Sequence, residues 1–383
     1  MRDKKFFWIF ALSSAVYFTQ GIEALPAQGL FYYLKESLKY SPEKIMLIGS
    51  ITTLAWLVKP VIGYVIDNFL HKRLWIFLSL AIDILLVLWL GLAQLPIILL
   101  VTLLVINSSD AAFRDVAVDG IMCVEGKIHQ VTGKIQSVQW ISLSIASFLS
   151  GILGGLIAEK WGYKASFLWL APVYALVGLT AYFYHEDSRA PRINRPRLTA
   201  DLKKLFANKH LLVIGLFIFL YKYSPSFGTP LFFIQRDTFK WGKVWIGTLS
   251  SIGTCFGIIG SLAYFKFSRQ IKLKRWLYGS VFLGAATTLS YLYYTPVTAV
   301  IYDILYSLMG MFIFLMVMDF MARNSVQGLE ATSFALLCSI SNLALVASNL
   351  SGALLLPLVG LKWLIIFSAL TSFLCLFLID KIE

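Results

Sequence analysis

Two stretches of this chain, 201 positions apart, are built to one pattern. Residues 30–41 read LFYYLKESLKYS, and residues 231–242 read LFFIQRDTFKWG. After the shared leucine and phenylalanine, a basic, an acidic, a hydroxyl, an apolar, a basic and an aromatic residue recur at a constant offset. The repeat predicts a chain made of two related halves.

Composition indicates that both halves lie in a membrane. The 383 residues are 58% hydrophobic and have a mean hydropathy of +0.77, well above the values of soluble domains. Apolar runs of about 20 residues, separated by short charged loops, predict twelve membrane-spanning helices. Their limits are 6–32, 44–66, 74–94, 96–124, 132–158, 164–184, 209–234, 243–265, 276–294, 296–321, 331–356 and 361–380.

The net charge of +13 reflects membrane topology rather than nucleic-acid binding. Of the 33 Lys and Arg residues, 21 fall on the side of the amino terminus and nine on the opposite side. This positive-inside bias predicts an integral protein of the cell (inner) membrane, a monomer with both termini in the cytoplasm. The four cysteines have no metal-ligand spacing, so we expect no metal and no cofactor.

One long basic loop, 185–208, separates six predicted helices from six. We therefore expect a bundle over 1–184, a cytoplasmic linker over 185–208, and a second bundle over 209–383. A parallel repeat of six helices is how one large class of secondary transporters is built, with the substrate site near the bilayer midplane. The predicted fold class is all-α integral membrane, with the major facilitator fold.

Four charges interrupt the fourth predicted span, where residues 107–120 read NSSDAAFRDVAVDG. An ionisable side chain at that depth is costly unless it faces a partner or a wet cavity. Asp110 and Arg114 lie one helical turn apart, which predicts an ion pair, and Asp115 and Asp119 form a second row beside it. We interpret the stretch as coupling substrate or ion movement; the alternative is a neutralised pair that only locks helices together.

The internal repeat relates a buried acid to a buried base. The offset carries Glu23 onto Ser224, two residues beyond Lys222, so the two charges should share a depth and face each other across a cavity. Alternatively, each pairs within its own half. Pro26 and Pro225 predict helix breaks beside them, which would expose backbone groups to a ligand.

These considerations define the candidate site. Tyr221 and Tyr223 flank Lys222 and are expected to stack on a flat ring, and Lys59 either contacts an anionic substrate or reaches the cytoplasmic surface. The expected substrate contacts are Lys222, Tyr221, Tyr223, Arg114, Lys59 and Gln28. The expected proton-coupling residues are Glu23, Asp110, Asp115 and Asp119. The four histidines fall at loops or helix ends, so carboxylates should carry any proton.

A gate is predicted after the second span. Gly63 and Asp67 are followed by Lys72 and Arg73, a pattern similar to the loop signature of major facilitators. Gly63 would allow close helix packing, while Asp67 would cap the next element and pair with the basic residues.

Some buried groups have no role in this scheme. Asp83 and Asp303 have no evident partner in the sequence, although a structural pairing is favoured for Asp83. Tyr291 and Tyr294 are more typical of interfacial belts or packing than of a ligand site.

Several motifs resemble the folate-biopterin transporter family. They are YFTQG at 17–21, WLVKPVIGYVID at 56–67, DVAVDG at 115–120 and EATSFALLCSISN at 330–342. The resemblance implies a pteridine- or folate-like substrate. The acidic stretch alone is also similar to muropeptide permeases and acetyl-coenzyme A transporters.

No phosphate-cradling loop, zinc-protease motif or nucleophile elbow occurs, so we expect a transporter driven by gradients and not an enzyme. The predicted function is secondary active transport of a small organic anion by alternating access, with proton coupling. The alternatives are a muropeptide or acyl-coenzyme A permease of the same fold, or a non-transporting membrane sensor or scaffold.

Overall fold

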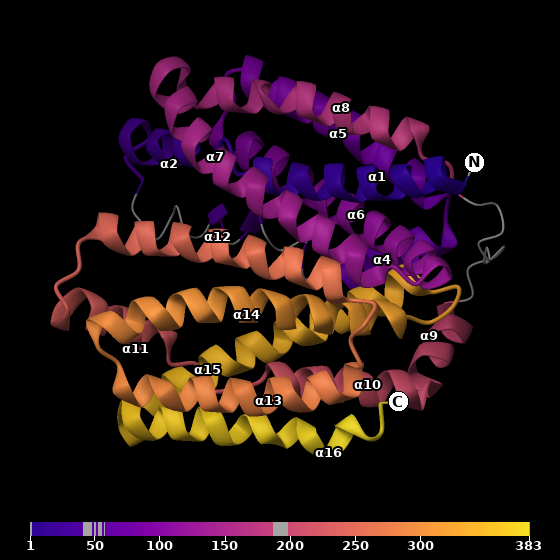
Figure 1. Cartoon of the computed structure of the whole chain (residues 1–383). Coiled ribbons are helices and arrows are strands. Elements are labelled where there is room, and N and C mark those ends of the chain that lie inside the picture. Colours follow the sequence, from indigo (N-terminus) through magenta and orange to yellow (C-terminus); the bar gives the residue numbers. More distant parts are fainter. Residues whose placement is uncertain are drawn as a thin grey trace. The chain divides into compact units, whose positions relative to one another are not determined.

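The computed structural model describes residues 2–40, 48–49, 51–52, 56, 58–186 and 198–382, and all regular structure in these residues is helical (Figure 1). The chain divides into two compact units. Unit 1 comprises Met1–Pro196 and Ser325–Ala335, and unit 2 comprises Arg197–Asn324 and Leu336–Glu383.

The helices of the first segment are α1 (Arg2–Ile22), α2 (Ala27–Tyr32), α4 (Lys59–Asn68), α5 (Lys72–Leu92), α6 (Ile97–His129), α7 (Thr132–Leu168) and α8 (Leu170–Phe183). Those that follow are α9 (Leu198–Ala207), α10 (Lys209–Lys222), α11 (Gly228–Phe233), α12 (Lys243–Phe267), α13 (Leu273–Ser290), α14 (Pro296–Arg323), α15 (Glu330–Thr371) and α16 (Leu376–Ile379). In unit 1, α1 packs mainly on α7, and α5 packs on α6 and α8; in unit 2, the main pair is α12 with α14.

Both predicted helix breaks are confirmed. α1 ends at Ile22 and α2 begins four residues after Glu23, with Pro26 at its amino-terminal boundary. α10 ends at Lys222, and the chain is not helical again until Gly228. The candidate acid and base therefore both lie where a helix is interrupted.

The internal repeat is confirmed in the backbone. At the offset of 201, α2 corresponds to α11, and the π-helical turn Tyr33–Ser37 corresponds to Ile234–Thr238. Each π turn is followed by a lysine in the left-handed region, Lys39 at φ 55° and Lys240 at φ 57°. Because lysine rarely adopts this conformation, its recurrence shows that the two stretches share one local fold.

Two long helical stretches each contain a glycine kink between two predicted spans. Gly162 in α7 has φ 77° and Gly360 in α15 has φ 73°, conformations that favour glycine. Five helical stretches within the described residues are long and apolar enough to cross a membrane. Two of them, Thr132–Phe183 and Glu330–Ile379, are each long enough for two spans. Much of the predicted span 44–66 lies outside the described residues, so the count of twelve stays a prediction.

Glycines bring helices into close contact at equivalent places of the two units. A Cβ on Gly154 of α7 would come within 2.5 Å of the backbone oxygen of Leu25, which follows α1. A Cβ on Gly352 of α15 would meet the backbone of Ser226, which follows α10. Leu25 and Ser226 are related by the offset of 201, so each unit packs a glycine against its own broken helix.

This packing makes Gly154→Leu and Gly352→Leu destabilising. Overpacking a close contact costs about 1–3 kcal/mol, and leucine is a good helix former, so the loss should reflect the contact. Gly178→Leu in α8 is the matched control, because nothing lies within 4 Å of its Cβ position. Thermal unfolding of the three purified variants in detergent measures the effect. A loss as large in Gly178→Leu would contradict the packing argument.

Candidate functional site

The charged stretch of α6 organises the polar contacts of unit 1. Arg114 is fully buried and forms ion pairs with Asp83 of α5 and with Glu23, which follows α1. Its Nη1 also donates to Ser79 Oγ at 3.2 Å, and Asn107 Nδ2 donates to Asp83 Oδ1 at 2.7 Å. A buried guanidinium is stable only with paired charges and satisfied donors, so this group ties three helices together.

The predicted ion pair between Arg114 and Asp110 is wrong. Asp110 Oδ2 is buried and has no hydrogen-bond partner among the described residues, while Arg114 turns to Asp83 and Glu23. One-turn spacing places two residues on one face of a helix, but the long arginine side chain reaches a neighbouring helix instead. Asp110 remains beside the cluster, since it acts electrostatically on the same groups. Asp83 does have a structural partner, as expected, and that partner is Arg114.

Glu23 pairs with a cation of its own unit, Arg114. For Glu23 this agrees with the alternative to a Glu23–Lys222 pair, in which each charge pairs within its own half. Tyr174 of α8 donates a hydrogen bond of 3.1 Å to Glu23 Oε1, and its ring lies 5.3 Å from the Arg114 guanidinium. The side chain of Glu23 is 16% exposed, whereas those of Arg114 and Asp83 are wholly enclosed. Glu23 is therefore the accessible member of the Arg114 cluster, defined as Glu23, Asp83, Arg114 and the adjoining Asp110.

A second cluster lies along the other face of α6. Lys59, at the start of α4, pairs with Asp115 Oδ2 at 2.5 Å, and Gln20 of α1 donates to Asp115 Oδ1 at 2.5 Å. The Lys59 ammonium also lies 4.5 Å from the ring of Trp56, whose indole donates to Ser108. Lys59 is thus paired with an internal carboxylate, and its two predicted roles, contact with an anionic substrate or reach to the cytoplasmic surface, stay predictions.

Asp119 has no ion pair among the described residues. Tyr17 donates to its Oδ1 at 2.9 Å, and Gln139 of α7 donates to the same atom at 3.4 Å. The side chain is almost entirely enclosed. Asp115, Asp119 and Lys59 form what we call the Lys59 cluster, with two carboxylates and one cation.

The predicted gate residues contact a segment far along the chain. Asp67 accepts hydrogen bonds from the backbone N–H groups of Ala331 and Thr332, at 3.2 and 2.8 Å, and from the Thr332 hydroxyl at 2.7 Å. Gly63 lies against the same backbone, with its Cβ position 2.8 Å from the Ala331 oxygen. Lys72 lies 3.4 Å from Asp67. All of these residues belong to unit 1.

The expectation that Asp67 caps the next element is wrong, because Asp67 caps the first turn of α15 instead. His71 starts α5 without a side-chain cap. Asp67 follows the predicted second span, and burial raises the pKa of its carboxyl group, an effect that Lys72 and Thr332 oppose. Arg73 does not join this contact; its guanidinium donates to the carbonyls of Ala181 and Tyr182 at the end of α8, at 2.8 and 2.7 Å.

Lys222 is a partly buried cation of unit 2. Its ammonium lies 5.0 Å from the ring of Phe314 on α14 and makes no ion pair or hydrogen bond within the described part of the chain. Tyr221 is instead hydrogen-bonded to Ser280 of α13 at 2.6 Å, and the Tyr223 ring is parallel to that of Phe219. The two tyrosines thus have other partners. Gln28 lies in α2, but its side chain is outside what the structure describes.

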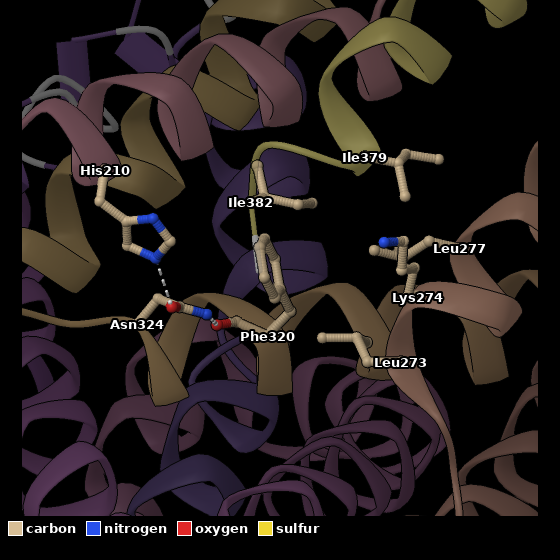
Figure 2. A pocket seen from close by; sticks show the side chains of 8 residues that line it. All are labelled: His210, Leu273, Lys274, Leu277, Phe320, Asn324, Ile379 and Ile382. Atoms are coloured by element: carbon tan, nitrogen blue, oxygen red, sulfur yellow. Dashed lines mark hydrogen bonds between the residues drawn. The ribbon is translucent and has the colours of Figure 1, made fainter.

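The described pockets do not contain the buried clusters. One of about 230 Å³ in unit 2 is mostly aliphatic, and His210 bonds to Asn324 at 3.1 Å beside it (Figure 2). Another of about 310 Å³ in unit 1 lies beside Arg73 and Glu186. Neither holds a residue of the Arg114 or Lys59 cluster, so the candidate site rests on the clusters and on Lys222.

Sequence reasoning missed several partners in these sites. Tyr174, Gln139 and Phe314 carry no local signal, because only helix packing brings them to the charged groups. Tyr17 and Gln20 did carry one, since both belong to the YFTQG motif one turn before Glu23.

Comparison with known proteins agrees with the sequence motifs. The profile of the BT1 family matches residues 20–380. A folate-biopterin transporter of Synechocystis sp. is 25% identical over 384 residues, which cover 92% of this chain and 76% of that protein. Folate transporter 2 of Plasmodium falciparum is 24% identical over 85% of this chain and 75% of its own length.

Solved structures show the fold. A crystal structure of the E. coli fucose:proton symporter superposes with a TM-score of 0.76 at 13% identity, over 98% of each chain. That of a human organic anion transporter gives 0.69 at 16% identity, over 97% of each chain. The first is a major facilitator superfamily transporter, so the predicted major facilitator fold is confirmed.

The Arg114 pairing generates a stability prediction. Arg114→Gln alone strands the carboxylates of Asp83 and Glu23 and should cost about 3–5 kcal/mol. Asp83→Asn leaves Arg114 paired with Glu23 and should cost less, and the double variant should cost clearly less than the sum of the two single changes. Denaturation of the purified variants in detergent supplies the double-mutant cycle. Asp110→Asn is the control and should have a small effect, since its carboxylate forms no ion pair within the described residues. Simple additivity of the two single changes would refute the pairing.

Proposed function

Because the chain belongs to the BT1 family, we propose that it is a secondary active transporter of a folate- or pteridine-like organic anion, working by alternating access with proton coupling. It is a membrane transporter and not an enzyme. The observation that carries the proposal is that both buried clusters of unit 1 hold more carboxylates than cations.

In the Arg114 cluster, one guanidinium faces Glu23 and Asp83, with Asp110 adjoining. Excess negative charge in an apolar span is costly, and uptake of a proton relieves it. Glu23 is the partly exposed carboxylate, so we assign it the exchangeable proton. Separation of Glu23 from Arg114 would load a proton, and renewed pairing would release it.

The Lys59 cluster has the same imbalance, with Asp115 and Asp119 sharing one ammonium. Asp115 holds the cation, while Asp119 is held by the neutral donors Tyr17 and Gln139. A second proton or an anionic substrate that competes for Lys59 would change this pairing. The arrangement supports coupling between charge arrival and proton binding.

Substrate recognition is assigned to Lys222, a cation that makes no ion pair among the described residues. Lys222 is held beside Phe314 at a break in the helix, where a carboxylate of the substrate would pair with it. A cation that has no internal anion loses less on binding an external one. Arg114, by contrast, is enclosed by its own carboxylates.

The topology follows from the charge bias. We place both termini on the cytoplasmic side of the cell (inner) membrane and assign the protein as a monomer, with bundles over 1–184 and 209–383 joined by 185–208. The contact of Asp67 with Thr332 would then lie on the cytoplasmic side, where its rupture and closure would gate that side of the membrane.

Uptake into proteoliposomes tests the function. The panel comprises folates, pterins, a muropeptide and an acyl-coenzyme A, each with and without an inward proton gradient. Accumulation of a folate or pterin that requires the gradient supports the proposal. Uptake of only the muropeptide or the acyl-coenzyme A would overturn the substrate assignment, and no transport of any compound would favour a sensor or scaffold.

Neutralising the exchangeable carboxylates should uncouple transport. Glu23→Gln and Asp115→Asn should lose gradient-driven accumulation about tenfold or more while keeping counterflow exchange, because exchange needs no net proton movement. Glu159→Gln, an exposed acid, is the control. If both variants accumulate substrate as the unmodified protein does, neither carboxylate couples protons.

Removing the Lys222 cation should weaken anion binding selectively. A charge-assisted hydrogen bond contributes about 1.5–3 kcal/mol, so Lys222→Gln should lower affinity for folate by about tenfold or more. A neutral pterin should be affected less. Lys209→Gln, an exposed lysine of the same helix, is the control, and equilibrium binding to purified protein is the measurement. Equal losses for both ligands would indicate a folding defect instead.

A further inference from the structure

A further charged side chain within an apolar helix of unit 2 is Asp303 of α14. It is half-buried and forms no ion pair or hydrogen bond among the described residues. A carboxylate at this depth requires a partner or a ligand. Neither the proton-coupling clusters nor the Lys222 contact uses it.

Three tyrosines lie near this carboxylate in the structure or the sequence. Tyr291 lies 5.1 Å from Tyr302 and 5.7 Å from Tyr294 between ring centroids, and Asp303 acts electrostatically on both Tyr291 and Tyr294. Phe227, from the break after α10, lies 5.5 Å from Tyr291. We call Asp303, Tyr291, Tyr294 and Tyr302 the tyrosine cluster. The cluster combines the two acceptor oxygens of the Asp303 carboxylate with flat aromatic rings.

The tyrosine cluster and the Lys222 contact lie along one face of α14. Asp303 and Phe314 are 11 residues apart, which is three turns and about 20° of rotation. At about 1.5 Å per residue, the rise between them is roughly 16 Å. Asp303 therefore lies on α14 about 16 Å along the helix from Phe314, the residue that the Lys222 ammonium of α10 faces. This separation is on the order of the length of an extended pteridine–aminobenzoate–amino acid conjugate.

We propose that Asp303 binds the 2-amino-4-oxo edge of a pteridine ring, which stacks in the tyrosine cluster, while Lys222 binds the carboxylate tail of the same molecule. The two parallel N–H groups of that edge match a carboxylate as a guanidinium does, and a flat ring stacks on the face of an aromatic side chain. The proposal rests on the proposed function and adds the orientation of the substrate in unit 2. Asp303 thereby selects the ring, and Lys222 selects the tail.

Separate halves of the substrate test this assignment. Biopterin carries the ring without a carboxylate, and p-aminobenzoylglutamate carries the tail without the pteridine. Asp303→Asn should weaken biopterin binding about tenfold or more and leave p-aminobenzoylglutamate unchanged, while Lys222→Gln should do the reverse. Asp237→Asn, which removes an exposed acid of unit 2, should change neither. Equilibrium binding to the full-length protein in detergent is the readout.

A change in the ligand gives a test that needs no variant. The unmodified protein should bind pterin about tenfold more tightly than lumazine, in which an oxo group replaces the 2-amino group of pterin. Equal binding of the two rings would overturn the proposal, as would an unchanged preference in Asp303→Asn. Binding of tetramethylammonium that requires Asp303 but does not compete with biopterin would show a cation site instead. If no pteridine or folate binds at all, the proposed function itself fails.

Discussion

The ion pairs of Arg114 with Asp83 and Glu23 are the interaction on which unit 1 depends. They join α6 to α5 and to the break after α1, and Tyr174 adds α8 through its bond to Glu23. Four helices therefore meet at one guanidinium. An unpaired charge at this place would cost several kcal/mol, so the helices cannot separate here unless a proton or another ion replaces the lost partner. Stability and coupling are consequently two aspects of the same contact.

The two units carry different chemistry. In the two buried clusters of unit 1, Arg114 and Lys59 are paired with internal carboxylates, and the carboxylates outnumber these cations. In unit 2, Lys222 and Asp303 each lack an internal counter-ion among the described residues, which leaves them for a ligand. A proton-coupled transporter needs both kinds of group. Some groups must exchange protons while the other buried charges stay paired, and others must find their partner in the substrate.

Local features of the fold could be predicted from the sequence, and long-range pairing could not. Hydropathy and proline positions predicted helix limits and the breaks at Glu23 and Lys222, because these depend on short stretches of chain. The partner of Arg114 depends on which residues of α5 face α6, and no spacing within α6 contains that information. Likewise, Asp67 follows a recognisable pattern, but its acceptor role toward Thr332 joins residues 265 positions apart. The partners of Tyr221 were missed for the same reason.

The recurrence of one backbone shape at an offset of 201 bears on the history of the chain. The π turn and the left-handed lysine occur in both copies, yet the ionisable groups do not: Glu23 corresponds to Ser224, and Arg114 corresponds to Leu315. Ser224 is held by the neutral hydroxyls of Ser348 and Ser368. The repeat has the pattern of a duplication, and the proton-exchanging groups proposed for unit 1 have no counterpart at these positions of unit 2. On the proposed assignment, substitutions in the ligand contacts of unit 2 would leave those groups unchanged, so new substrate preferences in such a lineage should arise mainly from substitutions in unit 2.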